Sequence, residues 1–297
     1  MFTRSALTAV LTAAAGLAAS AQHADFVLFG EPNPEADQVA PERQHVHPVT
    51  AGFYHEDSFV TSDIRAWYLY HDFPKSTAIS GGNVQAYAVQ VRVALTDQLQ
   101  FVAYKDGYAN FEAGLLQDDG FLDVAAGLKW NFLQDWENDL HAAVGIGYEL
   151  GVGDDEVLQE DDELRFWASV DKGFDRLHVG GTVNVLIATE SEDALGDSDR
   201  LLWHARADYY LCEWFSPVVE LNGYHTLDEG DNTPLNFNGV DLLNLGGGQS
   251  EDVVTIGLGG EIRPKDNLGL RFAYETPLTD RDDLFGYRWT LSAVLSF

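Results

Sequence analysis

A two-residue alternation of apolar and polar side chains constrains this chain more than any other feature of its sequence. In the clearest run, one face holds Leu140, Ala142, Val144, Ile146, Tyr148 and Leu150, and the other holds His141, Ala143, Gly145, Gly147 and Glu149. The run 122–132 alternates similarly, with Leu122 and Phe132 in its apolar set. Successive side chains of a strand point to opposite sides. Each run therefore predicts a strand with one apolar face, unlike the strands of an α/β protein, which are apolar on both faces.

Twelve such segments follow one another to the C-terminus. They span 62–73, 84–95, 99–106, 120–132, 139–151, 164–173, 177–188, 200–211, 215–225, 252–263, 267–276 and 287–297. Short connections such as 96–98 alternate with longer ones, up to 226–251. This is typical of bacterial outer-membrane barrels, whereas a soluble sandwich or lipocalin turns tightly at both ends. We predict an all-β fold: one antiparallel transmembrane β-barrel of about 12 strands, with short periplasmic turns, long acidic extracellular loops and both termini in the periplasm.

The N-terminus has the organisation of a cleaved secretory signal peptide. Arg4 precedes a mostly apolar run, and Ala19-Ser20-Ala21 supplies the pattern of small residues that signal peptidase cleaves. Residues 22–60 contain four prolines and no clear period, which predicts an irregular periplasmic tail or a small plug. The expected organisation is a signal peptide at 1–21, a tail or plug at 22–60 and the barrel at 61–297, located in the outer membrane.

The last segment, 287–297, ends in Phe297 and has apolar residues at alternate positions before it. It resembles the C-terminal assembly signal of bacterial outer-membrane proteins. The resemblance implies that the barrel-assembly machinery is a partner and that Phe297 belongs to the signal it recognises.

Residues 120–154 resemble part of a narrower family, the outer-membrane channel proteins associated with phenol (meta-pathway) degradation. The similarity rests on the sequence GFLDVAAGLKWNF at 120–132. The chain departs from that family at Leu122, where the family favours glycine, and at Gly151-Val152-Gly153, where the family has a Pro-Thr-Gly turn. The resemblance implies a channel, and it leaves an aromatic solute open.

The polar faces of the predicted strands carry an almost balanced set of charges. The lumen-lining residues expected from the alternation are Arg65, Arg92, Asp123, Lys129, Glu149, Arg165, Asp171, Arg206, Asp208, Glu220, Glu261, Arg263, Arg271, Glu275 and Arg288. These charges would either pair across neighbouring strands and fill the barrel or line a narrow polar path. Both are open because a barrel of about 12 strands lies between the filled barrels of 8 strands and the open porins of 16 strands. We predict passive movement of small solutes, of unknown identity, through a narrow polar lumen. The alternative is a filled structural or adhesive barrel that acts through its loops.

The chain as a whole is strongly acidic, with 48 Asp and Glu against 17 Lys and Arg and a formal charge of −31. This composition excludes nucleic acid as a partner, because phosphate binding needs clustered basic residues. The excess acid falls in loop groups at 154–163, 190–199 and 280–283. Such groups are solvated surface or weak sites for Ca²⁺ or Mg²⁺ that bridge lipopolysaccharide. Outer-membrane lipid and lipopolysaccharide are the expected surroundings.

No metal, cofactor or catalytic residue is predicted. His45 and His47, with His23 and His55 nearby, could bind a metal ion through their imidazoles. Their spacing in a proline-bounded tail favours an incidental cluster instead. An outer-membrane hydrolase is the enzyme alternative, and no serine can be placed opposite His225 to support it. The long segment Thr226–Glu251, which has apolar and glycine-rich stretches, is the candidate constriction loop.

Overall fold

A computed structural model describes residues 24–36, 39–75, 81–114, 117–157, 162–189, 199–228, 252–279 and 285–297. The predicted signal peptide, most of the loop 226–251 and most of the acidic loop groups lie outside these residues. The only helices among the described residues are the single 3-10 turns η2 (Pro41–Arg43) and η3 (Asp155–Val157). None of the helices in this part of the chain is long and apolar enough to cross a membrane.

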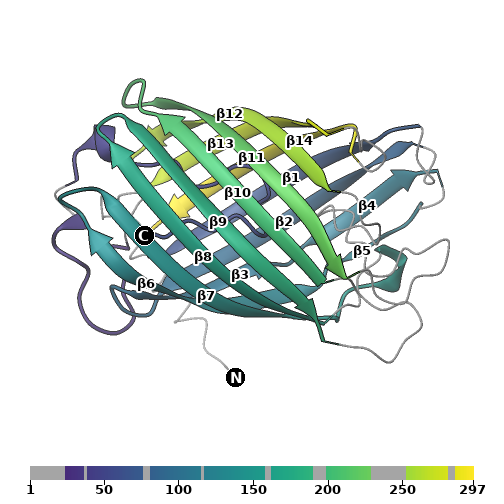
Figure 1. The fold of residues 1–297 in the computed structure, drawn as a ribbon, viewed down its shortest axis with the longest axis horizontal. Helices are drawn as coiled ribbons and strands as arrows, with labels where there is room; N and C mark the ends of the chain where they lie inside the picture. Colours follow the sequence, from purple (N-terminus) through teal and green to yellow (C-terminus); the bar gives the residue numbers. More distant parts are fainter. Residues whose placement is uncertain are drawn as a thin grey trace, which may run out of the picture.

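The strands form one closed antiparallel sheet (Figure 1). They are β1 (Asp63–Phe73), β2 (Gly82–Ala94), β3 (Leu99–Lys105), β4 (Tyr108–Ala113), β5 (Asp119–Phe121), β6 (Val124–Asp135), β7 (Leu140–Leu150), β8 (Glu163–Phe174), β9 (Leu177–Ala188), β10 (Asp199–Tyr209), β11 (Phe215–Asp228), β12 (Val253–Lys265), β13 (Leu268–Pro277) and β14 (Tyr287–Ser296). β3 and β4 follow one another in the chain and both pair with β2, so together they form one interrupted strand of the wall. On their other side, β5 pairs with β4 and β6 pairs with β3, so β5 and β6 together form a second interrupted strand. The wall therefore has twelve strands, as predicted.

The first and last strands close the barrel. β1 pairs with β14 from Asp63↔Ser296 to Asp72↔Tyr287, and it pairs with β2 along its other side. Closure gives each wall strand a hydrogen-bonded neighbour on both sides, which a sheet in hydrocarbon requires because no water is present to satisfy a free edge.

The outer surface of the barrel is apolar. The exposed side chains of β7 are Val144, Ile146, Tyr148 and Leu150, while His141, Ala143 and Glu149 of the same strand are buried in the interior. The aromatic residues Trp130, Phe166, Tyr274 and Trp289 are also exposed on the outside. An apolar exterior and a polar interior are the reverse of a soluble protein and match a barrel in lipid.

Leu122 corrects the predicted alternation. We expected it on the outer face, but it is buried, as is the following residue Asp123. The chain leaves the ladder between β5 and β6 at these two residues, so the alternation changes phase there. A second irregularity, between Asn131 and Leu133, leaves both Phe132 and Leu133 exposed. Such bulges shift the side-chain phase of a strand by one residue.

The chain before β1 lies inside the barrel. We call residues 44–62 the plug. The plug residues from His45 to Val49 and from His55 to Ser62 are buried. The plug is hydrogen-bonded to side chains on four strands of the wall: β6, β8, β11 and β13. Figure 1 shows this purple-to-blue part of the chain entering from the end that holds the C-terminus. The short turns are at that end, and the longer connections are at the other, which we call the long-loop end.

Candidate functional site

The candidate site is the lumen together with the plug that occupies it. Two plug carboxylates lie at its centre. Glu56 forms an ion pair with Arg92 of β2, and its other oxygen is 3.8 Å from Nζ of Lys129 on β6. Asp57 is 3.5 Å from the same Nζ and hydrogen-bonds His47 at 2.5 Å. All five side chains are almost fully buried, so each charge depends on these partners rather than on water.

Side chains of the wall also satisfy the plug backbone. Arg165 donates from Nη1 to the carbonyl oxygen of Phe53 at 2.9 Å and from Nη2 to that of Tyr54 at 2.8 Å. Glu220 accepts hydrogen bonds from the backbone N–H groups of Val49, at 2.8 Å, and Thr50, at 2.5 Å. An irregular buried segment has no ladder for its backbone groups, so it needs such partners.

A third set of contacts joins the plug to β8 and β6. Ser58 donates to Asp171 Oδ2 from its backbone N–H at 2.8 Å and from its hydroxyl at 2.7 Å. Asn131 donates to the carbonyl oxygen of Ser58 at 2.6 Å. The plug is therefore held to β8 and β6 by wall side chains rather than by strand pairing.

All but one of the fifteen residues predicted to line the lumen are buried, and Arg263 is partly exposed near the short-turn end. Most of them belong to ion pairs within the wall or with the plug. The wall pairs include Arg206 with Asp171 and Asp208, Arg263 and Arg271 with Glu261, and Arg288 with Glu275. Asp123 differs, because it accepts hydrogen bonds from the backbone of Val152 and Gly153 and so holds the β7–β8 connection.

The alternation missed several lumen charges. Lys105 pairs with Glu149, and Arg200 pairs with Glu163, all four being buried. A bulge at Ala103–Lys105 turns Lys105 inward beside Tyr104, and no sequence signal marks that bulge. Arg200 lies six positions before the inward-facing Arg206 in the same strand, so the two-residue alternation predicts that it also faces the lumen. Glu56 and Asp57 lie in the tail, which the strand pattern does not describe.

An apolar cluster of buried side chains lies in the half of the lumen nearer the long loops. It includes Phe53 and Tyr54 of the plug and, from the wall or the loops beside it, Trp67, Phe73, Val84, Phe111, Leu122, Leu186, Leu202, Tyr224 and Phe285. Buried charges contact the same cluster, because Arg200 lies over the Tyr54 ring and pairs with Glu163, and Arg288 lies over the Phe285 ring and pairs with Glu275. This half of the lumen is therefore both apolar and charged.

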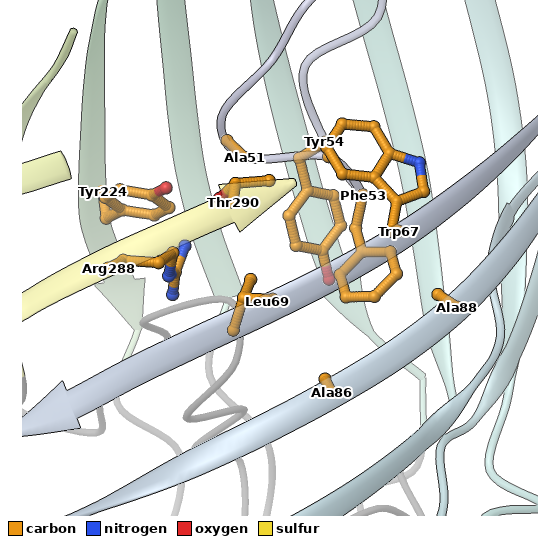
Figure 2. Close-up of a pocket in the computed structure, with 11 residues that line it drawn as sticks. Ala51, Phe53, Tyr54, Trp67, Leu69, Ala86, Ala88, Tyr224, Arg288 and Thr290 are labelled. Atoms are coloured by element: carbon orange, nitrogen blue, oxygen red, sulfur yellow. The ribbon is translucent and has the colours of Figure 1, made fainter. Parts of the chain in front are cut away.

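A small cavity lies beside the plug in this half of the lumen, and its lining is mostly apolar. Figure 2 shows Phe53 and Tyr54 beside Trp67 and Leu69, with Arg288 and Tyr224 on another side. The arrangement offers aromatic and aliphatic surface with one guanidinium group.

Metal-ligating side chains meet in one place among the described residues, at His45, Asp139 and His178. The tail histidines, expected to be an incidental cluster, lie apart where the structure describes them: His45 is in this cluster, His47 bonds Asp57, and His55 stacks on His204, while His23 lies outside the described residues. Burial raises the pKa of Asp139, but the hydrogen bond with His45 and the charges of His45 and Arg43 outweigh it, so this pKa lies below its usual range. His225, weighed for a hydrolase, accepts a hydrogen bond from Trp203 Nε1 at 2.8 Å and pairs with Asp252.

A closed antiparallel barrel of twelve strands, apolar outside and charged inside, defines a bacterial outer-membrane β-barrel protein, and this confirms the predicted fold class and location. The fold is similar to that of the COG4313 outer membrane channel from Pseudomonas putida F1, with a TM-score of 0.59 and 14% identity over 85% of this chain and 100% of that chain.

More distant solved structures include the NanC porin, with a TM-score of 0.49 and 10% identity over 80% of this chain and 98% of that chain. The KdgM porin follows, with a TM-score of 0.48 and 9% identity over 79% of this chain and 99% of that chain. No family model and no curated protein matches the sequence.

Proposed function

We propose that the protein is an outer-membrane channel through which small solutes pass when the plug is displaced. The observation that carries this proposal is the way the plug is held: its carboxylates and backbone groups bond wall side chains such as Lys129, Arg165 and Glu220. A barrel filled only for stability has no need of a separate segment in its lumen. The similar fold of the outer membrane channel from Pseudomonas putida F1 supports the same function.

The lining of the cavity beside the plug supports a solute class. On the wall, Trp67 and Tyr224 offer faces on which an aromatic ring can stack once the plug has moved, and the Arg288 guanidinium lies beside them. We propose small aromatic solutes on this ground. The sequence resemblance to channels of phenol degradation is consistent with it.

Planar-bilayer recordings of the mature protein test the channel function. The wild-type protein should show a small conductance with brief openings. The variant Glu56→Gln/Ser58→Ala, which removes the charge that pairs with Arg92 and the hydroxyl that donates to Asp171, should open more often. Val144→Ala on the lipid-facing side of β7 is the matched control and should behave as wild type. Absence of conductance in both the wild-type protein and the plug variant would favour the filled barrel that acts through its loops.

Liposome uptake tests the solute class separately. Vesicles containing the plug variant should admit phenol or benzoate faster than a sugar of similar size. Trp67→Ala should reduce this difference and leave ionic conductance in place. Equal rates for both solutes would contradict the aromatic assignment while leaving the channel function intact.

A further inference from the structure

Three buried side chains from separate parts of the chain meet at the short-turn end of the lumen. They are His45 of the plug, Asp139 in the turn between β6 and β7, and His178 on β9. One ligand atom from each lies within 4.8 Å of the other two. Nε2 of His45 is 3.0 Å from Asp139 Oδ1, and the two imidazole rings stack with centroids 4.3 Å apart. Two imidazoles and a carboxylate are the ligand types that bind zinc and related divalent transition metals.

His178 is already oriented as metal-binding histidines are. Its Nδ1 lies 2.7 Å from Asp208 Oδ2, and Asp208 in turn accepts a hydrogen bond from Arg206 at 3.0 Å. A carboxylate on one ring nitrogen fixes the tautomer and leaves the other nitrogen for the metal. That nitrogen, Nε2, lies 3.1 and 3.2 Å from the carbonyl oxygens of Glu42 and Asp175, which only accept hydrogen bonds, so it has to give up these contacts to bind an ion.

A fourth side chain gives an independent indication of a ligand. His141 on β7 is fully buried, and neither of its ring nitrogens has a hydrogen-bond partner among the described residues. Its Nε2 lies 3.8 Å from Asp139 Oδ1, while the rings of Phe59 and Trp136 pack against it. Buried polar atoms in native proteins are almost always satisfied. A bound cation beside Asp139 would satisfy this imidazole.

We propose that the protein binds one divalent transition-metal ion here, with Zn²⁺ the best match, through His45, Asp139 and His178, and with His141 as the fourth ligand. Tetrahedral zinc with bonds of about 2.0–2.1 Å places its ligand atoms about 3.3 Å apart. The ligand atoms therefore have to draw closer, and the stacked rings have to tilt, when the ion enters.

The site would join the plug to the wall. His45 belongs to the plug, whereas Asp139, His141 and His178 belong to the barrel. Arg43, just before the plug, has its Nε 3.6 Å from Asp139 Oδ2, so this guanidinium neutralises the carboxylate in the absence of metal and has to move away as the ion binds. A metal ion at this point therefore opposes displacement of the plug, which links metal supply outside the cytoplasm to the state of the lumen.

Metal counting on the whole mature protein tests the site. The folded protein in detergent is stripped with a chelator, dialysed against Zn²⁺, and its bound zinc is measured by mass spectrometry. We expect about one Zn²⁺ per chain, and Co²⁺ in its place should give the visible absorption of a tetrahedral site. His178→Gln and Asp139→Asn should each weaken binding at least tenfold, and Asp208→Asn should weaken it about tenfold because it orients a ligand.

His204→Gln is the matched control, because this buried histidine faces the same lumen, stacks on His55 and is not a proposed ligand. It should bind zinc as the wild type does. Heat-modifiable migration on gels shows whether each variant has folded. If one of the ligand variants does not fold, His141→Gln is tested in its place. The proposal is overturned if the wild type binds no tighter than the folded ligand variants, which would mean an adventitious metal only, or if His204→Gln loses binding equally.

Discussion

Nζ of Lys129, on the wall strand β6, donates a hydrogen bond to the backbone carbonyl oxygen of Asp57 in the plug at 3.0 Å. The same ammonium group is 3.5 Å from the Asp57 carboxylate and 3.8 Å from that of Glu56. One wall residue thus binds both the charge and the backbone of the plug. The charges that alternation places in the lumen therefore hold a segment inside it rather than only one another.

Glu56 gives the first prediction. Replacing it with glutamine leaves Arg92 buried beside a neutral group, with Asp63 4.0 Å away as its remaining carboxylate. Breaking a buried ion pair in this way costs about 3–5 kcal/mol. We expect Glu56→Gln to lower the free energy of unfolding, measured by urea titration in lipid vesicles, and to expose the plug to protease. The double variant Glu56→Gln/Arg92→Met should recover part of the loss; no recovery would mean that the pair is not the cause.

Gly145 gives a steric prediction. A Cβ atom at this position would lie 2.1 Å from the ring of Trp167, whose face carries the Arg165 guanidinium at 4.6 Å. Gly145→Ala should push Trp167 and Arg165 away from the plug carbonyl groups, with an overpacking cost of about 1–3 kcal/mol. Higher open probability in bilayer recordings is the expected readout. Val144→Ala, one residue away and facing lipid, should not raise it.

Phe297 gives an assembly prediction. Its backbone N–H donates to Ser62 at 2.9 Å, its carbonyl oxygen accepts from Phe26 at 3.2 Å, and the Phe26 and Phe297 rings are 6.2 Å apart. Deleting Phe297 should reduce the folded, heat-modifiable fraction in the outer membrane while secretion continues. Equal folded yield with and without Phe297 would contradict its role as an assembly signal.

Asp139 gives a pH prediction. Its pKa is lowered in the folded protein by His45 and Arg43, which outweigh its burial. A carboxyl group with a lowered pKa stabilises the folded state above its unfolded pKa, about 3.9, and this contribution is lost as pH falls through the lower, folded value. The thermal stability difference between wild type and Asp139→Asn should therefore be present at pH 6 and shrink as the pH falls below about 4. A difference independent of pH would show that the charge of Asp139 is not what stabilises this turn.

Alternation predicted the barrel well because its physical cause is local: one face of each strand meets lipid and the other does not. It failed where the ladder is interrupted, at Leu122, and where a bulge turns Lys105 inward. Bulges depend on neighbouring strands, which a single strand's sequence does not specify. The metal-ligating cluster was beyond prediction for a related reason. His45 and His178 are 133 positions apart, and only the path of the plug through the closed barrel brings them together.

The last prediction concerns ion preference. The described lumen charges are largely paired, so we expect the acidic long loops to set the selectivity of the open channel, with a mild preference for cations. Screening limits their reach to about 10 Å at 0.1 M salt and about 3 Å at 1 M, so the preference should fade as ionic strength rises. Reversal potentials across a salt gradient, measured at several ionic strengths with the plug variant Glu56→Gln/Ser58→Ala, provide the readout.

The residues to neutralise can be chosen from their contacts. Asp154 accepts a hydrogen bond from the backbone of Phe121 at 2.7 Å, and Asp162 accepts one from Gly151 at 2.7 Å, so both have structural roles. Glu156, Glu160 and Asp161 belong to the same acidic group in the sequence, and replacing them with amides in the plug variant should remove part of the low-salt cation preference without reducing conductance. Replacing Asp97 with asparagine at the short-turn end is the control, because it removes one acid from the opposite mouth. Anion preference at low salt would instead assign selectivity to the inward arginines, such as Arg92 and Arg165, that lose their plug partners when the plug is displaced.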